Sequence, residues 1–361
     1  SLHDALPILV DQEDGGGMGF NVGSTWKPIN MVAWMQKGHS INESLVTSTV
    51  YDTSKFNCNG YGFVGPWRVQ NSGGGTTSPE SPLQGLIKSH NTTQASMASN
   101  IGLCAIADAA KEMGYHNAIS NASDIYSANS FQPPMTIGTV QASPLTMANV
   151  YATMGANGVE CTPIAITKVT DRSGSKVKVP SANCHQAIDP DIAQTVSYAL
   201  NQGVVQPGGE ASTTQLDNNR KTFAKTGTNE NTVMTTAGFV PNQVAAFVAV
   251  ADAQDPINNT FDNKTINGVY RPSWYGMYIA TPAWKQFMNT YLAAINAPID
   301  NDYGKGADKY TVSKGATRTY NQYQYQRQQN SQQQSQQQTN QGQQQQSQQQ
   351  PAEQQSDQQH Q

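Results

Sequence analysis

Apolar residues recur at two different spacings up to Asn296, and the two spacings separate helical from strand-like segments. Helical spacing predicts α-helices over residues 24–36, 82–88, 93–113, 145–154, 191–202 and 281–294. Short β-branched runs predict strands over residues 162–170, 176–179, 222–226, 235–240 and 244–251. Residues 40–80 are rich in Gly, Ser, Thr and Asn, and we expect loops there.

The order of these elements indicates a mixed α/β fold of the α+β type. The helices come first, most strands come later, and the helix over residues 281–294 closes the pattern. The link Pro241-Asn-Gln243 is short enough to join the last two strands as an antiparallel hairpin. The apolar stripe of the closing helix consists of Trp284, Phe287, Met288 and Tyr291. We therefore expect an antiparallel sheet covered by helices.

Composition divides the chain into three parts. Residues 1–8 resemble a translated adapter sequence, so we exclude them from the fold and expect the natural chain to continue upstream. Residues 9–297 carry the apolar pattern and are expected to form one domain. We expect residues 298–361 to form a Gln-rich disordered tail, because the sequence from about Tyr320 has too few apolar side chains to offset the entropy of ordering. Composition leaves open whether this tail is a spacer or an interaction segment.

Charge and hydropathy exclude several classes of partner. The net charge is −4 and the 21 Lys and Arg residues are scattered, so the chain lacks the basic stripe that nucleic-acid binding requires. The sequence has no run of about 20 apolar residues, and we expect any membrane anchor to lie upstream. The histidines and cysteines show no metal-ligand spacing, and we expect no metal and no other cofactor.

Three short motifs occur in order along the chain: Ser24-Thr-Trp-Lys27, Ser89-His-Asn91 and Lys225-Thr-Gly227. Each is weak alone, because Ser24 could be an ordinary helix cap and the third motif an ordinary strand end. The S-x-x-K pattern also occurs at residues 173–176 and 175–178, within a predicted turn. Only Ser24 opens a predicted helix, where a residue three positions later shares its face. The ordered set is typical of class A β-lactamases and penicillin-binding proteins.

Longer segments resemble the transpeptidase domain of class A penicillin-binding proteins, of the actinobacterial type. The matching segments are residues 19–28 (GFNVGSTWKP), 144–148, 156–158, 223–231 (FAKTGTNEN), 237–241 and 280–288 (ATPAWKQFM). The similarity extends from about residue 15 to residue 292. The chain departs from the family at Val22, where a proline is usual. The resemblance implies a serine β-lactamase/transpeptidase-like fold with a helical subdomain beside the sheet.

The resemblance also implies roles for the motif residues in acyl transfer. Ser24 would attack the carbonyl of a peptidoglycan stem peptide that ends in D-Ala-D-Ala and form an acyl-enzyme, and β-lactams would acylate the same oxygen. Lys27 would be the base for this step, in a neutral form favoured by burial and by the positive charge of Lys225. The backbone N–H groups of Ser24 and Thr228 would form the oxyanion hole.

The remaining motif residues would bind and guide the substrate. Ser89 would pass a proton to the leaving D-Ala, and Asn91 would hold the substrate amide. Thr226 and Thr228 would bind the terminal carboxylate beside the lysine of the third motif, while Gly227 lets another group approach the strand. An amine from a neighbouring stem peptide would then resolve the acyl-enzyme and form the cross-link.

A class A synthase would act at the extracytoplasmic face of the membrane, and two alternatives stay open. A synthase would carry a membrane anchor and a glycosyltransferase domain upstream of this chain. A serine β-lactamase would need a base for deacylation, but Glu112 lies on a predicted helix and Glu160 lies beside a cysteine. A non-catalytic β-lactam sensor would acylate and signal without turnover. The upstream sequence would distinguish these alternatives.

The cysteines permit one disulfide to be predicted. An extracytoplasmic location allows thiols to oxidise. Cys161 and Cys184 flank the predicted strand, turn and strand over residues 162–179, whose antiparallel arms would bring the two Cα atoms within about 4.4–6.8 Å. Cys104 lies on a predicted helix among apolar residues, where we expect a buried free thiol, and Cys58 has no evident partner. We therefore expect a Cys161–Cys184 disulfide.

Overall fold

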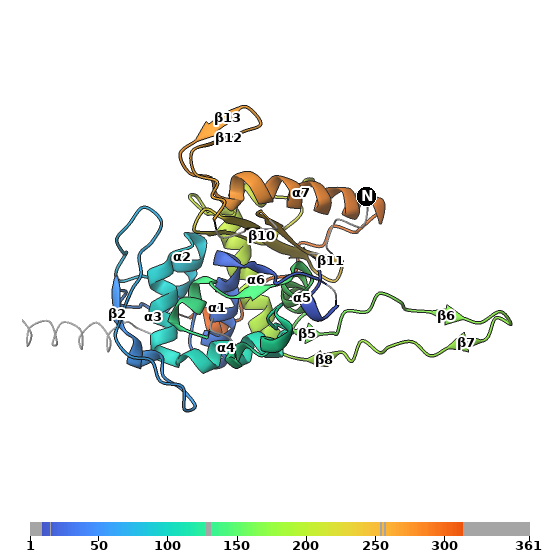
Figure 1. The fold of residues 1–361 in the computed structure, drawn as a ribbon, viewed down its shortest axis with the longest axis horizontal. Coiled ribbons are helices and arrows are strands. Elements are labelled where there is room, and N and C mark those ends of the chain that lie inside the picture. The colour runs from blue at the N-terminus through green and yellow to red at the C-terminus, as the bar shows by residue number, and fades with distance from the viewer. Residues whose placement is uncertain (1–8, 15, 128–130, 253–254, 256–257, 313–361) are drawn as a thin grey trace, which may run out of the picture. The chain divides into compact units, whose positions relative to one another are not determined.

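The computed structural model of the protein describes residues 9–14, 16–127, 131–252, 255 and 258–312. The expected adapter residues 1–8 and most of the expected tail, residues 313–361, lie outside the described residues. The described residues form helices and antiparallel strands in a mixed α/β fold (Figure 1). This architecture confirms the fold class predicted from the sequence.

Helices and strands of the described residues occur in the following order along the chain. The α-helices are α1 (Lys27–Gln36), α2 (Pro82–Ile87), α3 (Asn91–Ile101), α4 (Leu103–Glu112), α5 (Pro144–Gly155), α6 (Pro190–Val205), α7 (Gly276–Ala294) and α8 (Asp308–Thr311). The 3-10 helices are η1 (Gln12–Asp14), η2 (Gly23–Trp26), η3 (Thr53–Phe56), η4 (Ser120–Ala122), η5 (Ile125–Ser127), η6 (Pro133–Ile137) and η7 (Ser212–Thr214). The strands are β1 (Phe20–Asn21), β2 (Val50–Asp52), β3 (Pro66–Arg68), β4 (Gln141–Ala142), β5 (Val159–Glu160), β6 (Val169–Thr170), β7 (Lys176–Val177), β8 (His185–Gln186), β9 (Phe223–Asn229), β10 (Val233–Val240), β11 (Val244–Val250), β12 (Lys264–Ile266) and β13 (Val269–Arg271). Among the described residues, none of the helices combines the length and the hydropathy that a membrane span requires.

The main sheet has three antiparallel strands in the order β11-β10-β9 and lies between helices (Figure 1). α7 packs on one face, and α5 and α6 pack on the other. In α7, Trp284, Met288 and Leu292 are buried, whereas Phe287 and Tyr291 are 48% and 39% exposed. The prediction of an apolar stripe on this helix is therefore correct for Trp284 and Met288 and wrong for Phe287 and Tyr291. Because the sheet is narrow, it covers one i, i+4 row of the helix and leaves the neighbouring row in solvent.

α1 is the central helix of the other half of the fold. Every residue from Lys27 to Met35 is buried, and α3, α4 and α6 pack around the helix. A helix that is covered on all sides belongs to the core rather than to the surface. The preceding turn η2 packs against β9, so the helical half meets the sheet at the residues that lead into α1.

Several predicted elements have different limits in the structure; the closing helix α7, for example, begins at Gly276 rather than at residue 281. The helix expected over residues 93–113 is divided into α3 and α4 by Gly102, whose φ of 79° is incompatible with an α-helix. The strand expected over residues 222–226 continues as β9 to Asn229. Its pairing with β10 is unbroken from Phe223 to Asn229, so the third motif lies in the middle of the strand rather than at its end.

Residues 162–183 form an arm that extends away from the domain (Figure 1). The sequence predicts strands over residues 162–170 and 176–179, but within the arm only the two-residue strands β6 and β7 pair, near the turn. β5 pairs with β8 at the base of the arm. Most residues of the arm are exposed, and a two-stranded ribbon without a packed face forms little regular pairing. At the base, a disulfide joins Cys161 to Cys184, the pair expected from the sequence, with Cα atoms 4.1 Å apart.

A second disulfide corrects the expectations for Cys58 and Cys104. These two residues are bonded, with Cα atoms 5.8 Å apart, so Cys104 is not a free thiol and Cys58 has a partner. The bond links the loop after η3 to the first turn of α4 across 46 residues of sequence. The loop has no periodicity, and no local pattern predicts where it returns to the core.

The packed part of the chain continues past residue 297, where composition places the start of the tail. Tyr303 is buried, and its hydroxyl donates a hydrogen bond of 2.5 Å to the carbonyl oxygen of Met154. The guanidinium of Arg220 donates a hydrogen bond of 2.5 Å to the carbonyl oxygen of Pro298. Residues 298–312 therefore belong to the domain rather than to the tail.

Candidate active site

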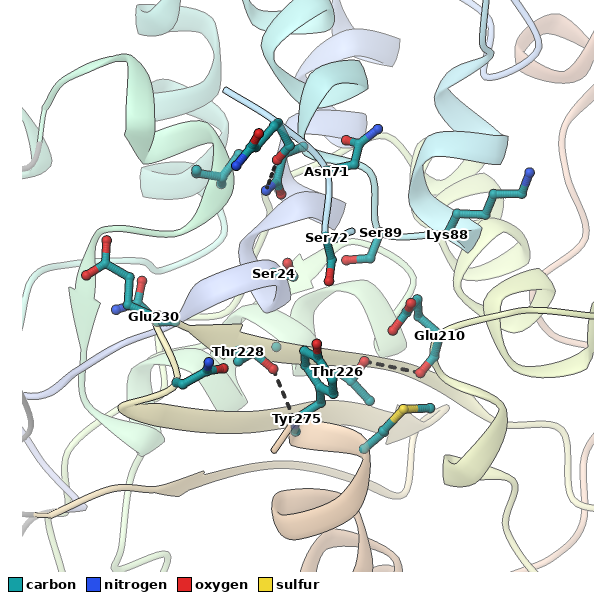
Figure 2. Close-up of a pocket in the computed structure, with 18 of the residues that line it drawn as sticks. Ser24, Asn71, Ser72, Lys88, Ser89, Glu210, Thr226, Thr228, Glu230 and Tyr275 are labelled. Carbon is teal, nitrogen blue, oxygen red and sulfur yellow. Dashed lines mark hydrogen bonds between the residues drawn. The ribbon is translucent and has the colours of Figure 1, made fainter. Parts of the chain in front are cut away.

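A cavity of about 760 Å³ lies where η2 and the start of α3 face the edge strand β9 (Figure 2). The motif residues that line it are Ser24, Ser89, Asn91, Thr226, Gly227 and Thr228. Lys27 and Lys225 are buried beneath this lining, with exposed fractions of 0% and 2%. Hydrogen bonds connect the three motifs across 62 and 136 residues of sequence. The fold thus brings the residues of all three sequence motifs together around one cavity.

Ser24 lies in η2, directly before α1, and its side chain is partly exposed to the cavity. The helix expected to start at Ser24 therefore begins as a 3-10 turn that continues into α1. The preceding Gly23 has a φ of 56°, and its N–H donates a hydrogen bond of 2.9 Å to the carbonyl oxygen of Gly138. The carbonyl oxygen of Val22 accepts a hydrogen bond of 3.0 Å from Thr235 Oγ1. These contacts fix the turn that presents Ser24 against β10 and the end of η6.

Lys27 extends from the first turn of α1 toward the second motif. Its Nζ lies 2.5 Å from the carbonyl oxygen of Ser89, 3.2 Å from Ser89 Oγ and 2.7 Å from Asn91 Oδ1. Burial lowers the pKa of Lys27 well below its ordinary value, and the nearby charge of Lys225 lowers it further, while Glu210 opposes the shift. The environment therefore favours a neutral amine at Lys27, one turn after Ser24.

Ser89 connects the two lysines of the site. Lys225 Nζ donates a hydrogen bond of 2.9 Å to Ser89 Oγ, the same oxygen that lies 3.2 Å from Lys27 Nζ. Lys225 also donates a hydrogen bond of 2.9 Å to the carbonyl oxygen of Thr226. Burial lowers the pKa of Lys225 to about 8, against the opposing charge of Glu210. A hydroxyl held between two amines can pass protons between them and the cavity.

The turn that carries Ser89 and Asn91 is fixed from behind by a buried carboxylate. Ser89 has a φ of 55°, a left-handed conformation that needs support from its surroundings. His90 Nδ1 lies 2.9 Å from both carboxylate oxygens of Glu80, which is 5% exposed, and Thr93 Oγ1 donates a hydrogen bond to the same carboxylate. The sequence motif does not identify Glu80, which lies upstream of it in a loop.

Asn91 is the first residue of α3 and connects Lys27 to the opposite wall of the cavity. Its Oδ1 accepts the hydrogen bond from Lys27, and its Nδ2 donates a hydrogen bond of 3.0 Å to the carbonyl oxygen of Gln70. Both ends of the amide are therefore held by the protein. A side chain oriented in this way presents a fixed polar edge to the cavity.

Gly227 allows the turn that carries Ser24 to approach β9 closely. A Cβ atom at Gly227 would lie 2.2 Å from Thr235 Oγ1 and 3.2 Å from the backbone nitrogen of Ser24, so any side chain would displace its neighbours. On either side of this glycine, Thr226 Oγ1 donates a hydrogen bond of 3.2 Å to the carbonyl oxygen of Glu210, and Thr228 Oγ1 accepts one of 3.1 Å from the N–H of Gly276. The strand therefore offers two hydroxyls beside the Ser24 backbone.

Several cavity residues lie outside the motifs and are missed by sequence reasoning. They include Glu210, Glu230, Asn71, Ser72 and Tyr275, which come from loops and from the start of α7 (Figure 2). No spacing rule marks these positions, because each reaches the cavity through long-range packing. Among the described residues, no group of three or more His, Cys, Asp or Glu side chains could hold a metal ion.

The fold and the cavity bring a serine on a constrained turn together with two buried lysines and two strand hydroxyls. The family model described as "Penicillin binding protein transpeptidase domain" matches residues 19–286. The chain therefore belongs to the penicillin-binding protein transpeptidase domain family. This finding confirms the family resemblance stated from the sequence.

Curated relatives include the penicillin-binding proteins 1A of two bacteria. The chain is 28% identical over 280 residues to the protein of Neisseria meningitidis. The aligned region covers 75% of this chain and 31% of that protein. It is 26% identical over 213 residues to the protein of Clostridium acetobutylicum, and this match covers 57% of the chain and 25% of that protein. The chain thus spans about a third or less of the length of these relatives.

Solved structures of penicillin-binding proteins share the fold. The structure of PonA1 from Mycobacterium tuberculosis in complex with penicillin V has a TM-score of 0.64 and 20% identity, over 82% of this chain and 75% of that chain. Penicillin-binding protein 1A from Haemophilus influenzae has a TM-score of 0.60 and 20% identity, over 80% of this chain and 45% of that chain. At these identities the likeness concerns the fold alone.

Proposed function

We propose that the protein is a D,D-transpeptidase that cross-links peptidoglycan stem peptides through an acyl-enzyme on Ser24. The observation that carries this proposal is the connection of Lys27 and Lys225 through Ser89 Oγ, directly beside the Ser24 turn. Membership of the transpeptidase family supports the reaction class. The role of each residue is the one that the family resemblance implies, and the arrangement of the residues around the cavity supports it.

Lys27 is the base in the acylation step. A neutral amine has two N–H donors and one lone pair. The short contacts to the carbonyl oxygen of Ser89 and to Asn91 Oδ1 can use the two N–H donors, which leaves the lone pair for a hydroxyl proton. The Ser24 oxygen bonds to the substrate carbonyl carbon, and the Ser24 proton moves to Lys27. The lowered pKa of Lys27 supplies the neutral form.

Ser89 completes the proton path to the leaving group. As the peptide C–N bond breaks, the leaving D-Ala nitrogen takes the Ser89 proton, and Ser89 is reprotonated from the amines that contact its Oγ. In a β-lactam the same nitrogen belongs to the ring and stays attached to the acyl group. The acyl-enzyme therefore retains the whole drug.

β9 binds the two anionic parts of the reacting group. The backbone N–H groups of Ser24 and Thr228 stabilise the developing oxyanion, and Gly227 allows this close arrangement. The terminal carboxylate binds at Thr226, Thr228 and the ammonium of Lys225. That ammonium has three donors, of which Ser89 and the Thr226 carbonyl engage two. The amine of a second stem peptide then attacks the acyl carbon, forms the new amide and releases Ser24.

We further infer that the chain works at the extracytoplasmic face of the cell membrane. Peptidoglycan is assembled there, and two disulfides suit an oxidising compartment. This chain covers 31% of penicillin-binding protein 1A of Neisseria meningitidis, and its resemblance is to class A enzymes. A membrane anchor and a glycosyltransferase domain upstream of this chain are therefore part of the proposal.

A reconstituted cross-linking assay tests this function. The protein is incubated with a stem pentapeptide ending in D-Ala-D-Ala and with a stem peptide that supplies the acceptor amine, and mass spectrometry follows the products. We expect release of D-Ala and a cross-linked dimer, both abolished by penicillin. Rapid catalytic hydrolysis of a chromogenic cephalosporin would instead indicate a β-lactamase, and acylation without any peptide product would indicate a sensor.

A further inference from the structure

Glu210 is an acidic residue inside the cavity that the acyl-transfer proposal does not use. It follows Gly208 and Gly209, is half-buried, and lines the cavity with Ser89 and Thr226. Its backbone is fixed at both ends, because its N–H donates a hydrogen bond of 3.0 Å to the carbonyl oxygen of Ile87 and its carbonyl oxygen accepts the bond from Thr226 Oγ1. Figure 2 shows its carboxylate directed into the cavity.

The position of Glu210 relative to β9 decides which part of a ligand it meets. Thr226 is one of the hydroxyls proposed to bind the ligand carboxylate, and it contacts Glu210 directly. The charge of Glu210 also acts on Lys27 and Lys225, the two buried lysines behind that hydroxyl. The side chain of Lys88, which lines the same wall, is directed away from Glu210 (Figure 2). A negative charge on a backbone-anchored residue therefore lies beside the end of the cavity that is proposed to bind the ligand carboxylate.

Glu230 provides a natural comparison within the same cavity. It lies in the turn between β9 and β10, and its side chain is exposed. Thr226 and the end of β9 at Asn229 are three strand positions apart, about 10 Å along an extended chain, and Glu230 follows in the turn. The two carboxylates therefore lie at opposite ends of the cavity, and Glu210 is the one that adjoins Thr226 (Figure 2).

We propose that Glu210 forms a binding subsite for a positively charged group carried next to the carboxylate of the acyl donor. The subsite attracts donors with a cationic substituent at this end, is indifferent to neutral ones, and repels those with a second negative charge. Among β-lactams, the class it favours is cephalosporins with a cationic substituent at the 3′ position, because that position is adjacent to the ring carboxylate. The inference rests on the proposed function, in which this end of the cavity receives the carboxylate.

Two cephalosporins with the same acyl side chain test the subsite, one with a neutral 3-acetoxymethyl group and one with a cationic 3-pyridiniummethyl group. Acylation rates of the whole protein are measured by competition with a fluorescent penicillin. For each protein, the acylation rate of the cationic drug is divided by that of the neutral drug, and this ratio is compared between the wild-type protein and Glu210→Gln. Comparing the two ratios cancels the intrinsic reactivity of each drug. We expect the ratio to fall about threefold to tenfold in Glu210→Gln. This is the effect of removing one charge whose attraction is partly screened by solvent and salt.

Glu230→Gln is the matched control, and its ratio should equal that of the wild-type protein. Raising the salt concentration from 50 mM to 1 M in the wild-type protein should lower the ratio in the same direction, which provides a measurement that needs no variant. An unchanged ratio in Glu210→Gln and in high salt would overturn the subsite, as would an equal fall in Glu230→Gln. Failure of both drugs to acylate the wild-type protein would overturn the proposed function itself, a result distinguishable from an unchanged ratio.

Discussion

Lys225 donates a 2.9 Å hydrogen bond to the Oγ of Ser89 across 136 residues of sequence, and this contact joins the last motif to the second. The same oxygen lies 3.2 Å from Lys27, so one hydroxyl connects the strand motif to the helix motif. The two buried lysines would repel each other if both were charged, and the lowered pKa of Lys27 relieves that repulsion.

Removing the connecting hydroxyl should impair chemistry more than folding. We expect Ser89→Ala to lower the acylation rate by about 10²- to 10⁴-fold, the range for loss of a positioned proton-transfer group, with a melting temperature close to that of the wild-type protein. Stopped-flow acylation by a penicillin measures the rate. Ser72→Ala, at another serine of the cavity wall, should change the rate by less than about threefold. Equal rates for Ser89→Ala and the wild-type protein would rule out the proton path.

The two lysines predict a bell-shaped dependence of the acylation rate on pH. The rate should rise with pH as Lys27 loses its proton, at a pH well below its ordinary pKa of 10.5. It should fall above about 8, where Lys225 loses the charge that binds the carboxylate. In Lys225→Arg the guanidinium keeps its proton at all accessible pH values, so the alkaline fall should disappear. Persistence of that fall in the variant would assign it to another group.

Gly227 should tolerate no side chain, because Thr235 and the Ser24 backbone occupy the space. We expect Gly227→Ala to lose about 1–3 kcal/mol of unfolding free energy and most of its acylation rate. Thermal unfolding and penicillin labelling measure the two effects. Gly62→Ala is the control, since nothing lies within 4 Å of a Cβ atom at that exposed position. Normal labelling of Gly227→Ala would contradict the close approach of η2 to β9.

The two disulfides should differ in their contribution to stability. The Cys58–Cys104 bond closes a separation of 46 residues and joins parts of the core, whereas Cys161–Cys184 closes 23 residues at the base of an exposed arm. In the chain-entropy model their values are about 4 and about 3 kcal/mol. Replacing each pair by serines and measuring thermal unfolding should show the larger loss for Cys58 and Cys104. The opposite order would mean that the arm is part of the cooperative core.

Motif residues were predictable from sequence because their chemistry is tied to local geometry. Ser24 and Lys27 are three residues apart at the start of a helix, and the third motif lies on a strand that begins at Phe223. The order of helices and strands followed from apolar periodicity. Those signals are local, and the family resemblance supplied the long-range assembly that they lack.

Glu80, Glu210 and Cys58 show what local patterns leave out. Each lies in a segment rich in Gly, Pro or polar residues, and each acquires its role only when the chain returns to a distant element. The division of the expected helix at Gly102 has a different cause, since one glycine with a positive φ outweighed good helix formers on both sides.

Covalent labelling of Ser24 tests the central claim most directly. The protein is treated with a penicillin, and intact mass followed by peptide mapping locates the adduct. We predict one penicilloyl group on Ser24 that persists for many minutes, complete loss of the adduct in Ser24→Ala, and normal labelling of Ser173→Ala and Ser175→Ala, whose S-x-x-K matches lie in the exposed arm. An adduct that survives in Ser24→Ala would contradict the account.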